Sequence, residues 1–168
     1  MTRPLPADVR IRRATDADVP ALGRLGASLL RLHYAYDAQR FMAPRGDPEE
    51  GYAWFLGSQL REDDVVIFVA ERVAGPSGEI VGYVYAGLEP QSWKELRDAA
   101  GFIHDVLVDD AHRRAGVAAA LLDAASEWLK AHGAPRVMLW TAERNHAAQR
   151  LFEQAGFRRT MIEMTREL

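Results

Sequence analysis

The chain has 168 residues, of which 48% are hydrophobic and 27% are charged. This composition is typical of a folded globular protein and excludes collagen-like and wholly disordered chains, and the length fits one domain spanning residues 1–168. The net charge is −3, from 21 Lys and Arg against 24 Asp and Glu, so no basic field is available for a phosphate backbone and we expect no nucleic-acid partner.

The chain contains no cysteine. Disulfides, thiolate metal sites and cysteine nucleophiles are therefore excluded, and we expect no bound metal. The N-terminal residues are rich in arginine, and no apolar run approaches the length of about 18 residues that a membrane-spanning helix needs. We expect a cytoplasmic protein with no membrane association.

The N-terminal part begins with a predicted strand and two predicted helices. Apolar and charged residues alternate in Val9–Arg12, which indicates an edge strand. Apolar residues then recur at helical spacing and predict an amphipathic helix: Val19, Leu22, Leu25, Leu29 and Leu32. A second helix is predicted from the N-cap residue Asp47, with Pro48 at its first position, to about Leu60.

Three apolar runs of strand length occupy the middle of the chain. Val65–Glu71 and Ile80–Leu88 predict two antiparallel strands joined by a turn at Ala74–Gly78. Gly101–Val108 predicts a third strand. Before it, the spacing of polar residues in Ser92–Glu95 matches a capping box and predicts a short helix.

The C-terminal part returns to alternating helices and strands. Apolar spacing predicts a long helix from Val117, with a stop at Gly133. A strand over Arg136–Trp140, a helix over Asn145–Gly156 and a final strand within Phe157–Leu168 follow. This order predicts an α/β fold whose sheet is partly antiparallel and becomes parallel around the long helix.

The segment Val106–Ala119 joins a predicted buried strand to the long helix through a short loop. Backbone N–H groups without partners and the positive end of the helix dipole favour anion binding at such a junction. Gly116, Ala118 and Ala119 are small enough to let a phosphate approach. The alternative is that Gly116 only eases a turn and that the nearby arginines are solvated. Neither a Walker A nor a G-x-G-x-x-G pattern occurs, which argues against a nucleoside triphosphate or dinucleotide site.

These residues resemble the GNAT superfamily of N-acetyltransferases. Its loop signature, Arg/Gln-x-x-Gly-x-Gly/Ala after a strand of Leu-x-Val-Asp type, is matched by Arg113–Ala118 after Val106–Asp109. Its second pattern, Asn-x-x-Ala, Leu-Tyr and then Gly-Phe, is matched by Asn145–Ala148, Leu151–Phe152 and Gly156–Phe157. The resemblance covers nearly the whole chain and implies a mixed, mostly antiparallel sheet that splays at its fourth and fifth strands, flanked by about four helices.

The resemblance also implies acetyl-CoA as co-substrate. Its diphosphate would lie on the backbone N–H groups of Arg114–Ala119, and its pantetheine arm would bond to the edge of the preceding strand. The N–H near Val106 would polarise the thioester carbonyl and stabilise the oxyanion. The implied cofactor-binding residues are Val106, Leu107, Val108, Arg113, Arg114, Ala115, Gly116, Val117, Ala118, Ala119, Asn145 and Phe152.

Direct acetyl transfer needs a base, because an aliphatic amine with a pKa of about 10.4 is mostly protonated at neutral pH. At the position where members of the GNAT superfamily often have a carboxylate, this chain has His104. The neighbouring residue Asp105 is the other candidate for the base. Side chains alternate along a strand, so both face the cleft only if a bulge intervenes. We favour His104; the alternative is a structural imidazole at His104 and a loop-capping carboxylate at Asp105.

Two further residues carry open alternatives. Many relatives have a tyrosine at the position of Phe152, where it protonates the departing thiolate, and a phenyl ring has no such proton. Water, the ammonium proton, Tyr83 or Tyr85 are the alternative donors, although such aromatic residues are also typical of a core. For Asn145 the alternatives are that it binds the cofactor, that it caps its helix, or that it does both.

We therefore predict an N-acetyltransferase that moves an acetyl group from acetyl-CoA to a primary amine by direct attack in a ternary complex. A small-molecule amine is the favoured acceptor, and a protein N-terminus or lysine is the alternative. A non-catalytic acyl-CoA-binding sensor is the alternative function, which Phe152 favours. Only one strand fits after Gly156, where many relatives have two, so a homodimer that pairs this sheet edge is a further hypothesis.

Overall fold

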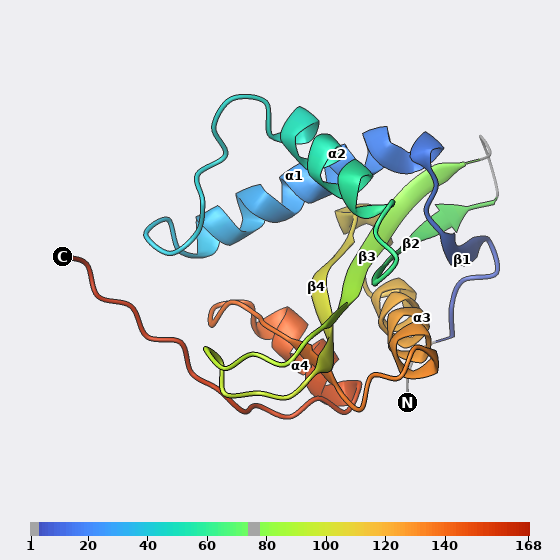
Figure 1. Cartoon of the computed structure of the whole chain (residues 1–168). Helices are drawn as coiled ribbons and strands as arrows, with labels where there is room; N and C mark the ends of the chain where they lie inside the picture. Colours follow the sequence, from blue (N-terminus) through green and yellow to red (C-terminus); the bar gives the residue numbers. More distant parts are fainter. Residues whose placement is uncertain (1–3, 74–77) are drawn as a thin grey trace.

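The computed structural model describes residues 4–73 and 78–168, and the strands in these ranges form one sheet in the order β1-β2-β3-β4-β5 (Figure 1). The strands are β1 (Val9–Arg13), β2 (Val65–Arg72), β3 (Glu79–Glu89), β4 (Ala100–Val108) and β5 (Val137–Leu139). The first four are antiparallel neighbours, and β5 runs parallel to β4. The predicted α/β class, the antiparallel pair β2-β3 and the parallel step around the long helix are confirmed.

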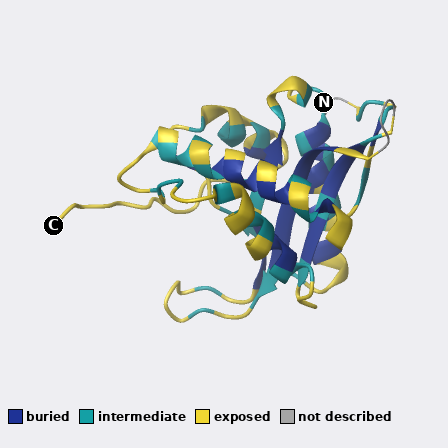
Figure 2. Ribbon diagram, turned by 90° about the horizontal axis from the view of Figure 1, so that it is seen from above, coloured by how far each residue is buried: buried dark blue, intermediate teal, exposed yellow. Residues whose placement is uncertain are grey.

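Helices cover both faces of the sheet. They are α1 (Val19–Tyr36), α2 (Pro48–Gln59), α3 (Val117–Ala131) and α4 (His146–Gln154), with short 3-10 helices η1 (Asp16–Asp18) and η2 (Asp110–His112). Side chains of α1 and α2 form one core cluster with Tyr83 and Tyr85 of β3, whereas α3 and α4 share a second cluster with Val84. Figure 2 shows the buried residues gathered in the strands and on the inner helix faces. None of the described helices is both long and apolar enough to cross a membrane.

Two helix starts follow directly from local sequence. The Asp47 carboxylate accepts hydrogen bonds from the backbone N–H groups of Glu49 and Glu50, over 3.0 and 3.1 Å. The Asn145 side chain accepts one from the N–H of Ala148 over 3.1 Å. Both residues satisfy N–H groups that the first helical turn leaves without a partner, which confirms them as N-caps.

The helices α1 and α2 are closely packed at Gly26. A Cβ atom at this position would lie 2.0 Å from Cδ1 of Tyr52, so no larger residue fits without displacing that ring. The close approach fixes Tyr52 against α1 and thereby sets one wall of a groove described below.

The prediction of a short helix from Ser92–Glu95 is wrong. The N–H of Glu95 does bond to the Ser92 hydroxyl over 3.2 Å, but the segment is a turn closed by a bridge between Ser92 and Arg97. Leu96 has a φ of 53°, which a helix does not allow. The guanidinium of Arg97 also bonds to the carbonyl of Pro90 over 2.9 Å, and these contacts hold the turn closed.

The final strand predicted within Phe157–Leu168 is also not formed. The chain after α4 pairs with no described strand and runs away from the sheet, as Figure 1 shows. A strand is stable only with a neighbour, and the path of this segment brings none alongside. The predicted turn at Ala74–Gly78 falls mostly outside the described residues.

Candidate active site

The sheet opens between β4 and β5. The two strands pair only where Gly101–Ile103 lies beside Val137–Leu139. Within the described ranges no strand continues this pairing, so the part of β4 from His104 to Val108 has a free edge along the opening. The predicted splay of the fourth and fifth strands is confirmed.

The register of β4 against β3 decides which backbone groups face the opening. The N–H of Asp109 donates to the carbonyl of Val81 over 2.8 Å, so Asp109 bonds toward β3. Alternate residues of an antiparallel ladder bond to the same neighbour, and Leu107 therefore also bonds toward β3. Val106 and Val108 direct their N–H and C=O groups the other way, into the opening.

A β-bulge in β4 turns two chemically active side chains to one face. Tyr85 of β3 lies opposite Asp105 and Ala86 opposite Ile103, so His104 is the extra residue of the bulge. Asp105 shares the face of its partner Tyr85, and the ring of His104 stacks on Tyr85 with 4.7 Å between centroids. The bulge that the alternation of side chains requires is present, and His104 and Asp105 both lie on the face covered by α1 and α2.

His104 lies among aromatic rings, directly after the part of β4 that pairs with β5. Its ring stacks on Tyr85 and, with 5.4 Å between centroids, on Phe102. Its Nε2 is 3.4 Å from Oε1 of Glu89, and 30% of the side chain is exposed. Burial lowers the pKa of His104, and the Glu89 carboxylate opposes that shift in part. The imidazole is therefore neutral at physiological pH and is able to accept a proton.

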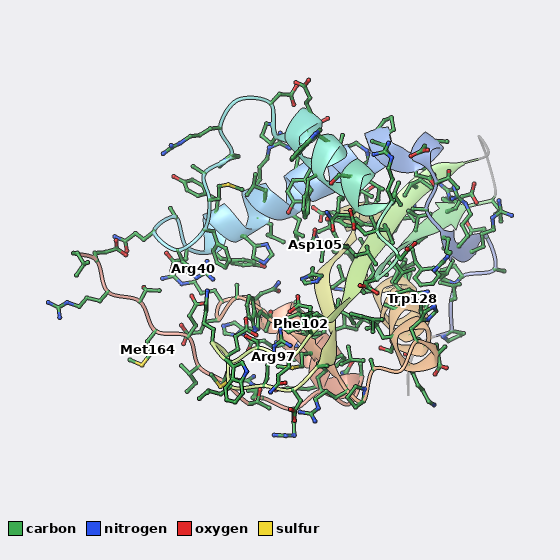
Figure 3. The ribbon with its side chains drawn as sticks, in the orientation of Figure 1. Arg40, Arg97, Phe102, Asp105, Trp128 and Met164 are labelled. Carbon is green, nitrogen blue, oxygen red and sulfur yellow. The ribbon has the colours of Figure 1, made fainter. Side chains whose placement is uncertain are left out.

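The position of Glu89 depends on Arg97, whose side chain is only 9% exposed. Nη2 of Arg97 lies 2.5 Å from Oε2 of Glu89, and the guanidinium stacks over Phe102, 5.5 Å from the ring centroid. Figure 3 shows Arg97 and Phe102 next to each other at the lower part of the sheet. One oxygen of Glu89 is thus fixed by Arg97 while the other faces His104.

Asp105 is a partly buried carboxylate on the same face. It accepts a hydrogen bond from the hydroxyl of Tyr83 over 2.9 Å. Burial raises the pKa of Asp105 to about 6, although the Tyr83 hydroxyl and the charge of His33 oppose the rise. At neutral pH Asp105 is mostly ionised and places a negative charge next to His104.

The hydroxyl groups of Tyr83 and Tyr85 are both engaged. Tyr83 is fully buried and donates to Asp105, and burial raises its pKa well above the ordinary value. Tyr85 donates to Oε1 of Gln59 over 2.9 Å, and burial raises its pKa to about 12. These contacts argue against either tyrosine as the proton donor for a thiolate.

The start of α3 has a backbone that an anion can approach closely. Arg114 and Gly116 have φ values of 60° and 83°, and Gly116 caps the helix without a side-chain hydrogen bond. The first-turn N–H groups have no intrahelical partner and lie at the positive end of the helix dipole. These N–H groups belong to Val117, Ala118 and Ala119. The residues at Ala115, Gly116 and Ala118 have small side chains or none, which leaves room for an anion.

Arg113 braces this loop against the end of β4. Its Nε donates to the carbonyl of Val108 over 3.1 Å, and its Nη2 lies 2.8 Å from Oδ1 of Asp110. The side chain therefore ties the loop to the free edge of the strand. The loop before α3 is thereby fixed at the end of the strand edge.

Asn145 and Phe152 have structural roles in α4. Asn145 caps the helix, which is one of the two roles left open by the sequence. Phe152 is 7% exposed and belongs to the core cluster under α3 and α4, with its ring 6.1 Å from that of Phe157. No hydroxyl group is available at this position.

A groove of about 900 Å³ lies between α1, α2 and the segment that joins them. Its lining is rich in aromatic residues: Tyr34, Phe41, Tyr52, Trp54 and Phe55. The charged residues of the lining are one arginine, Arg45, and one aspartate, Asp47, and the carboxylate of Asp47 is used as the cap of α2. The groove is therefore apolar and close to electrically neutral.

Aromatic contacts connect the groove to His104. The ring of Phe55 lies 6.2 Å from that of Tyr52 and 5.8 Å from that of Tyr85, which stacks on His104. On the other side of His104, Phe102 contacts Trp140, at 5.4 Å between centroids. A row of aromatic rings thus runs from the groove across the site to the residue that follows β5.

Three residues near His104 were not found from the sequence. Phe102 had a usable signal, because it lies two positions before His104 on the same strand. Arg97 and Trp140 lie in or next to loops, where no periodic pattern exists. Among residues 4–73 and 78–168, no cluster of three or more His, Asp or Glu side chains is arranged to hold a metal ion.

Comparisons with known proteins agree on one family. A model described as the acetyltransferase (GNAT) family matches residues 29–157. Mycothiol acetyltransferase of Thermobispora bispora is 32% identical over 123 residues, which are 70% of this chain and 40% of that protein, so the chain spans only two fifths of that relative.

Solved structures share the fold at low identity. The tetramutant of the BH1408 protein from Bacillus halodurans has a TM-score of 0.76 at 20% identity, covering 95% of this chain and 99% of that chain. The aminoglycoside N-acetyltransferase AAC(6')-Iy, in a complex with CoA, has a TM-score of 0.72 at 17% identity, covering 95% of this chain and 94% of that chain. These likenesses concern the arrangement of helices and strands.

Proposed function

Since the chain belongs to the acetyltransferase (GNAT) family, we propose that it transfers an acetyl group from acetyl-CoA to a primary amine by direct attack in a ternary complex. One observation carries the proposal: the edge of β4 at Val106 leads to the start of α3, and His104 and Asp105 precede it on the sheet face that α1 and α2 cover. This arrangement offers an anion site, an oxyanion donor and a base in one place. The CoA complex of the structural relative AAC(6')-Iy supports the choice of co-substrate.

In this proposal, acetyl-CoA lies along the loop before α3 and the edge of β4. The N–H groups of Val117–Ala119 bind the diphosphate, because the helix dipole and the small side chains favour a close anion. The amide groups of the pantetheine arm bond to the backbone of Val106 and to the N–H of Val108 as a further strand would, while the Val108 carbonyl accepts from Arg113. The thioester carbonyl then meets the N–H of Val106.

The transfer proceeds through one tetrahedral intermediate. His104 takes a proton from the ammonium group of the acceptor, directly or through a water molecule, and the freed lone pair attacks the thioester carbon. The carbonyl π electrons move to the oxygen, and the N–H of Val106 stabilises this oxyanion. As the intermediate collapses, the C–S bond breaks, and the thiolate takes one of the two protons on the acetylated nitrogen, which leaves a neutral amide with one N–H. Protonated His104 then releases its proton to water. The ionised Asp105 favours the cationic acceptor on the same face.

We propose a small-molecule amine with an apolar part as acceptor. The groove between α1 and α2 is lined by aromatic residues and carries almost no net charge, so it favours a ring or an alkyl chain over a polycation. The row from Phe55 to Tyr85 and His104 leads from this groove to the reacting atoms. The acceptor would place its apolar part in the groove and its amino group at His104.

The test is amine-dependent release of CoA by the purified chain. Because the protein contains no cysteine, a thiol reagent reports free CoA without background. The panel contains phenylethylamine, spermidine, an aminoglycoside and a peptide with a free N-terminus, and mass spectrometry detects the acetylated product. We expect turnover with phenylethylamine, a reduction of kcat by about 100-fold in His104→Gln, and unchanged CoA binding in that variant.

The second candidate is a non-catalytic module that binds acyl-CoA, and the buried Phe152 favours it because no acid stands in that position. The same experiment separates the two. A sensor binds acetyl-CoA in a calorimetric titration but releases no CoA with any amine of the panel. A chain that binds no CoA at all would exclude both candidates.

A further inference from the structure

One guanidinium group contacts two neighbours of the His104 ring. The ring has the carboxylate of Glu89 on one side, with 3.4 Å between Oε1 and Nε2, and it stacks on Phe102, with 5.4 Å between centroids. Nη2 of Arg97 lies 2.5 Å from Oε2 of Glu89, and the guanidinium carbon lies 5.5 Å from the centroid of Phe102. Arg97 therefore supports both a charged and an aromatic neighbour of the imidazole.

Arg97 is itself held in place by the turn between β3 and β4, and its side chain is only 9% exposed. Nη1 donates to the carbonyl oxygens of Pro90 and Asp98, over 2.9 and 3.3 Å. Nε donates to Oε2 of Glu95. Since Nη2 pairs with Glu89, each of the three guanidinium nitrogens has an acceptor. A planar guanidinium bonded at every nitrogen is a rigid support for the groups that it contacts.

Glu89 determines which nitrogen of the neutral His104 ring carries the hydrogen. A carboxylate oxygen accepts a hydrogen bond and repels a lone pair, so an oxygen 3.4 Å from Nε2 favours the hydrogen on Nε2. Nε2 also lies over β3, because a Cβ atom at Gly87 would be 3.8 Å from it. The lone pair is then on Nδ1, which has no hydrogen bond to any residue of the described ranges. Nδ1 is therefore the nitrogen that is able to accept a proton.

The position of Glu89 influences the titration of His104. Titratable side chains also lie on the other elements around the ring, and together with Glu89 they are Tyr85, Asp105, His33 and Tyr52. Burial lowers the pKa of His104, and the Glu89 carboxylate raises it in part. A movement of Glu89 away from the ring would remove this contribution and lower the pKa of His104 further.

We propose that Arg97 is a positioning residue, which holds Glu89 and Phe102 against His104 so that the imidazole keeps its Nε2–H toward the carboxylate and offers Nδ1 as the basic atom. The use of Nδ1 in acetyl transfer rests on the proposed function, whereas the support of His104 by Arg97 does not. In the transfer, an N–H bond of the acceptor ammonium breaks, the proton binds to Nδ1, and the electron pair stays on the amine nitrogen. The positive charge that forms on the imidazolium then faces the Glu89 carboxylate, which stabilises it.

NMR of protein labelled with heavy nitrogen at histidine tests the positioning without any turnover. The chain has five histidines, and a spectrum of His104→Gln identifies the signals of His104. We expect the neutral ring to carry its hydrogen on Nε2. The pKa of His104 should fall in Glu89→Gln, and it should fall in the same way in Arg97→Met, because Glu89 moves away once the guanidinium is lost. The double variant should titrate like either single variant, since both changes remove one contact.

The sign of the change in Arg97→Met separates positioning from a simple effect of charge. If Glu89 kept its place without Arg97, the loss of a positive charge would raise the pKa of His104. A raised or unchanged pKa, or a neutral ring with its hydrogen on Nδ1, would overturn the proposal. Glu95→Gln is the matched control, because Glu95 bonds to Nε of Arg97 on the side away from Glu89, and it should leave the pKa of His104 unchanged.

A second variant covers the case in which Arg97→Met does not fold, which circular dichroism detects. Arg97→Lys keeps the positive charge but replaces three bonded nitrogens by one ammonium group. Any change in the pKa of His104 then reports the position of Glu89 and not the charge of its partner. In that case we expect the pKa to fall in Arg97→Lys, and an unchanged pKa would overturn the proposal.

Kinetics connect the positioning to the proposed transfer. In Arg97→Met, kcat should fall about 10-fold with an unchanged KM for acetyl-CoA, because loss of a group that orients a histidine typically costs about 10- to 100-fold. Glu95→Gln should keep the kcat of the parent chain. A higher KM for the amine with an unchanged kcat would make Arg97 a wall of the acceptor site, which contradicts the positioning role. If no amine releases CoA but the NMR results hold, the support of His104 by Arg97 stands, and the catalytic use of Nδ1 fails together with the proposed function.

Discussion

Nε2 of His104, the bulge residue of β4, lies 3.4 Å from Oε1 of Glu89, the last residue of β3. The other oxygen of Glu89 is held by Arg97. The carboxylate therefore remains next to the imidazole whether or not His104 carries a proton, and it favours the protonated form. This relationship links the catalytic proposal to a measurable pH dependence.

Replacing Glu89 by Gln should shift the pH profile of acetyl transfer. Burial lowers the pKa of His104 and Glu89 raises it, so removal of the carboxylate lowers this pKa further. A base acts only when it is deprotonated, and the acid limb of kcat/KM is expected to move to lower pH in Glu89→Gln. The measurement is kcat/KM between pH 5 and 8, on the order of the range in which histidine titrates. An acid limb in the same place in both proteins would contradict the assignment of His104 as the base.

Replacing Asp105 by Asn should stabilise the fold at neutral pH. The pKa of Asp105 is raised to about 6 in the folded chain, from 3.8 when it is exposed, so the folded state holds the proton more tightly. The stabilisation is fully present below the unfolded pKa and is lost as the pH rises through about 6. At pH 7.5 the variant should gain about 1–2 kcal/mol in the free energy of unfolding, because it removes a buried charge and keeps an acceptor for Tyr83.

Urea unfolding measures this gain at several pH values. The difference between Asp105→Asn and the parent chain should shrink toward pH 4, of the order of the unfolded pKa, where both carry a neutral side chain. Equal stability at pH 7.5 would mean that Asp105 ionises at no cost. A loss of acetyl transfer in the more stable variant is expected, because sites that hold a charge for function commonly reduce stability.

Replacing Ala118 by Glu tests the diphosphate site. A carboxylate in the first turn of α3 interacts favourably with the helix dipole. Because Ala118 is partly buried against the core, the larger side chain has a packing cost, which a variant of equal size measures separately. The same charge repels a diphosphate bound to the neighbouring N–H groups, and CoA should bind at least 10-fold more weakly in calorimetry. Ala118→Gln, with nearly the same size and no charge, is the matched control. Unchanged CoA affinity in Ala118→Glu would place the diphosphate elsewhere.

Local sequence patterns determined those parts of the fold that depend on local contacts. The caps at Asp47 and Asn145 were predictable because each carboxylate or amide bonds to N–H groups two or three residues away. The antiparallel pair β2-β3 was predictable from its apolar runs, and the parallel step from the long helix between β4 and β5. Segment 92–97 was not predictable, since Arg97 closes it through contacts with Pro90 and Glu89.

The candidate site was likewise predictable only where it depends on residues that are close in the sequence. The loop before α3 carries a local motif, whereas the bulge at His104 depends on the register between β3 and β4 and leaves no trace in the residues of β4 alone. The sequence therefore named His104 and Asp105 but left open whether they share a face. The support of Glu89 by Arg97 joins a strand end to a loop, and no spacing rule reports such a contact.

Replacing Trp54 by Ala should weaken the binding of acceptors with an apolar part. Trp54 lines the groove and is 75% exposed, so a ligand has much of its indole ring to cover. Burying half of such a ring contributes about 1–2 kcal/mol, which corresponds to about a 10-fold rise in KM for the amine. The KM for acetyl-CoA should stay constant, because the start of α3 is unchanged. Trp93→Ala is the control, since Trp93 is 83% exposed but lies on the turn between β3 and β4, outside the groove. If both variants raise the KM of the amine equally, or if neither does, the groove between α1 and α2 does not receive the acceptor.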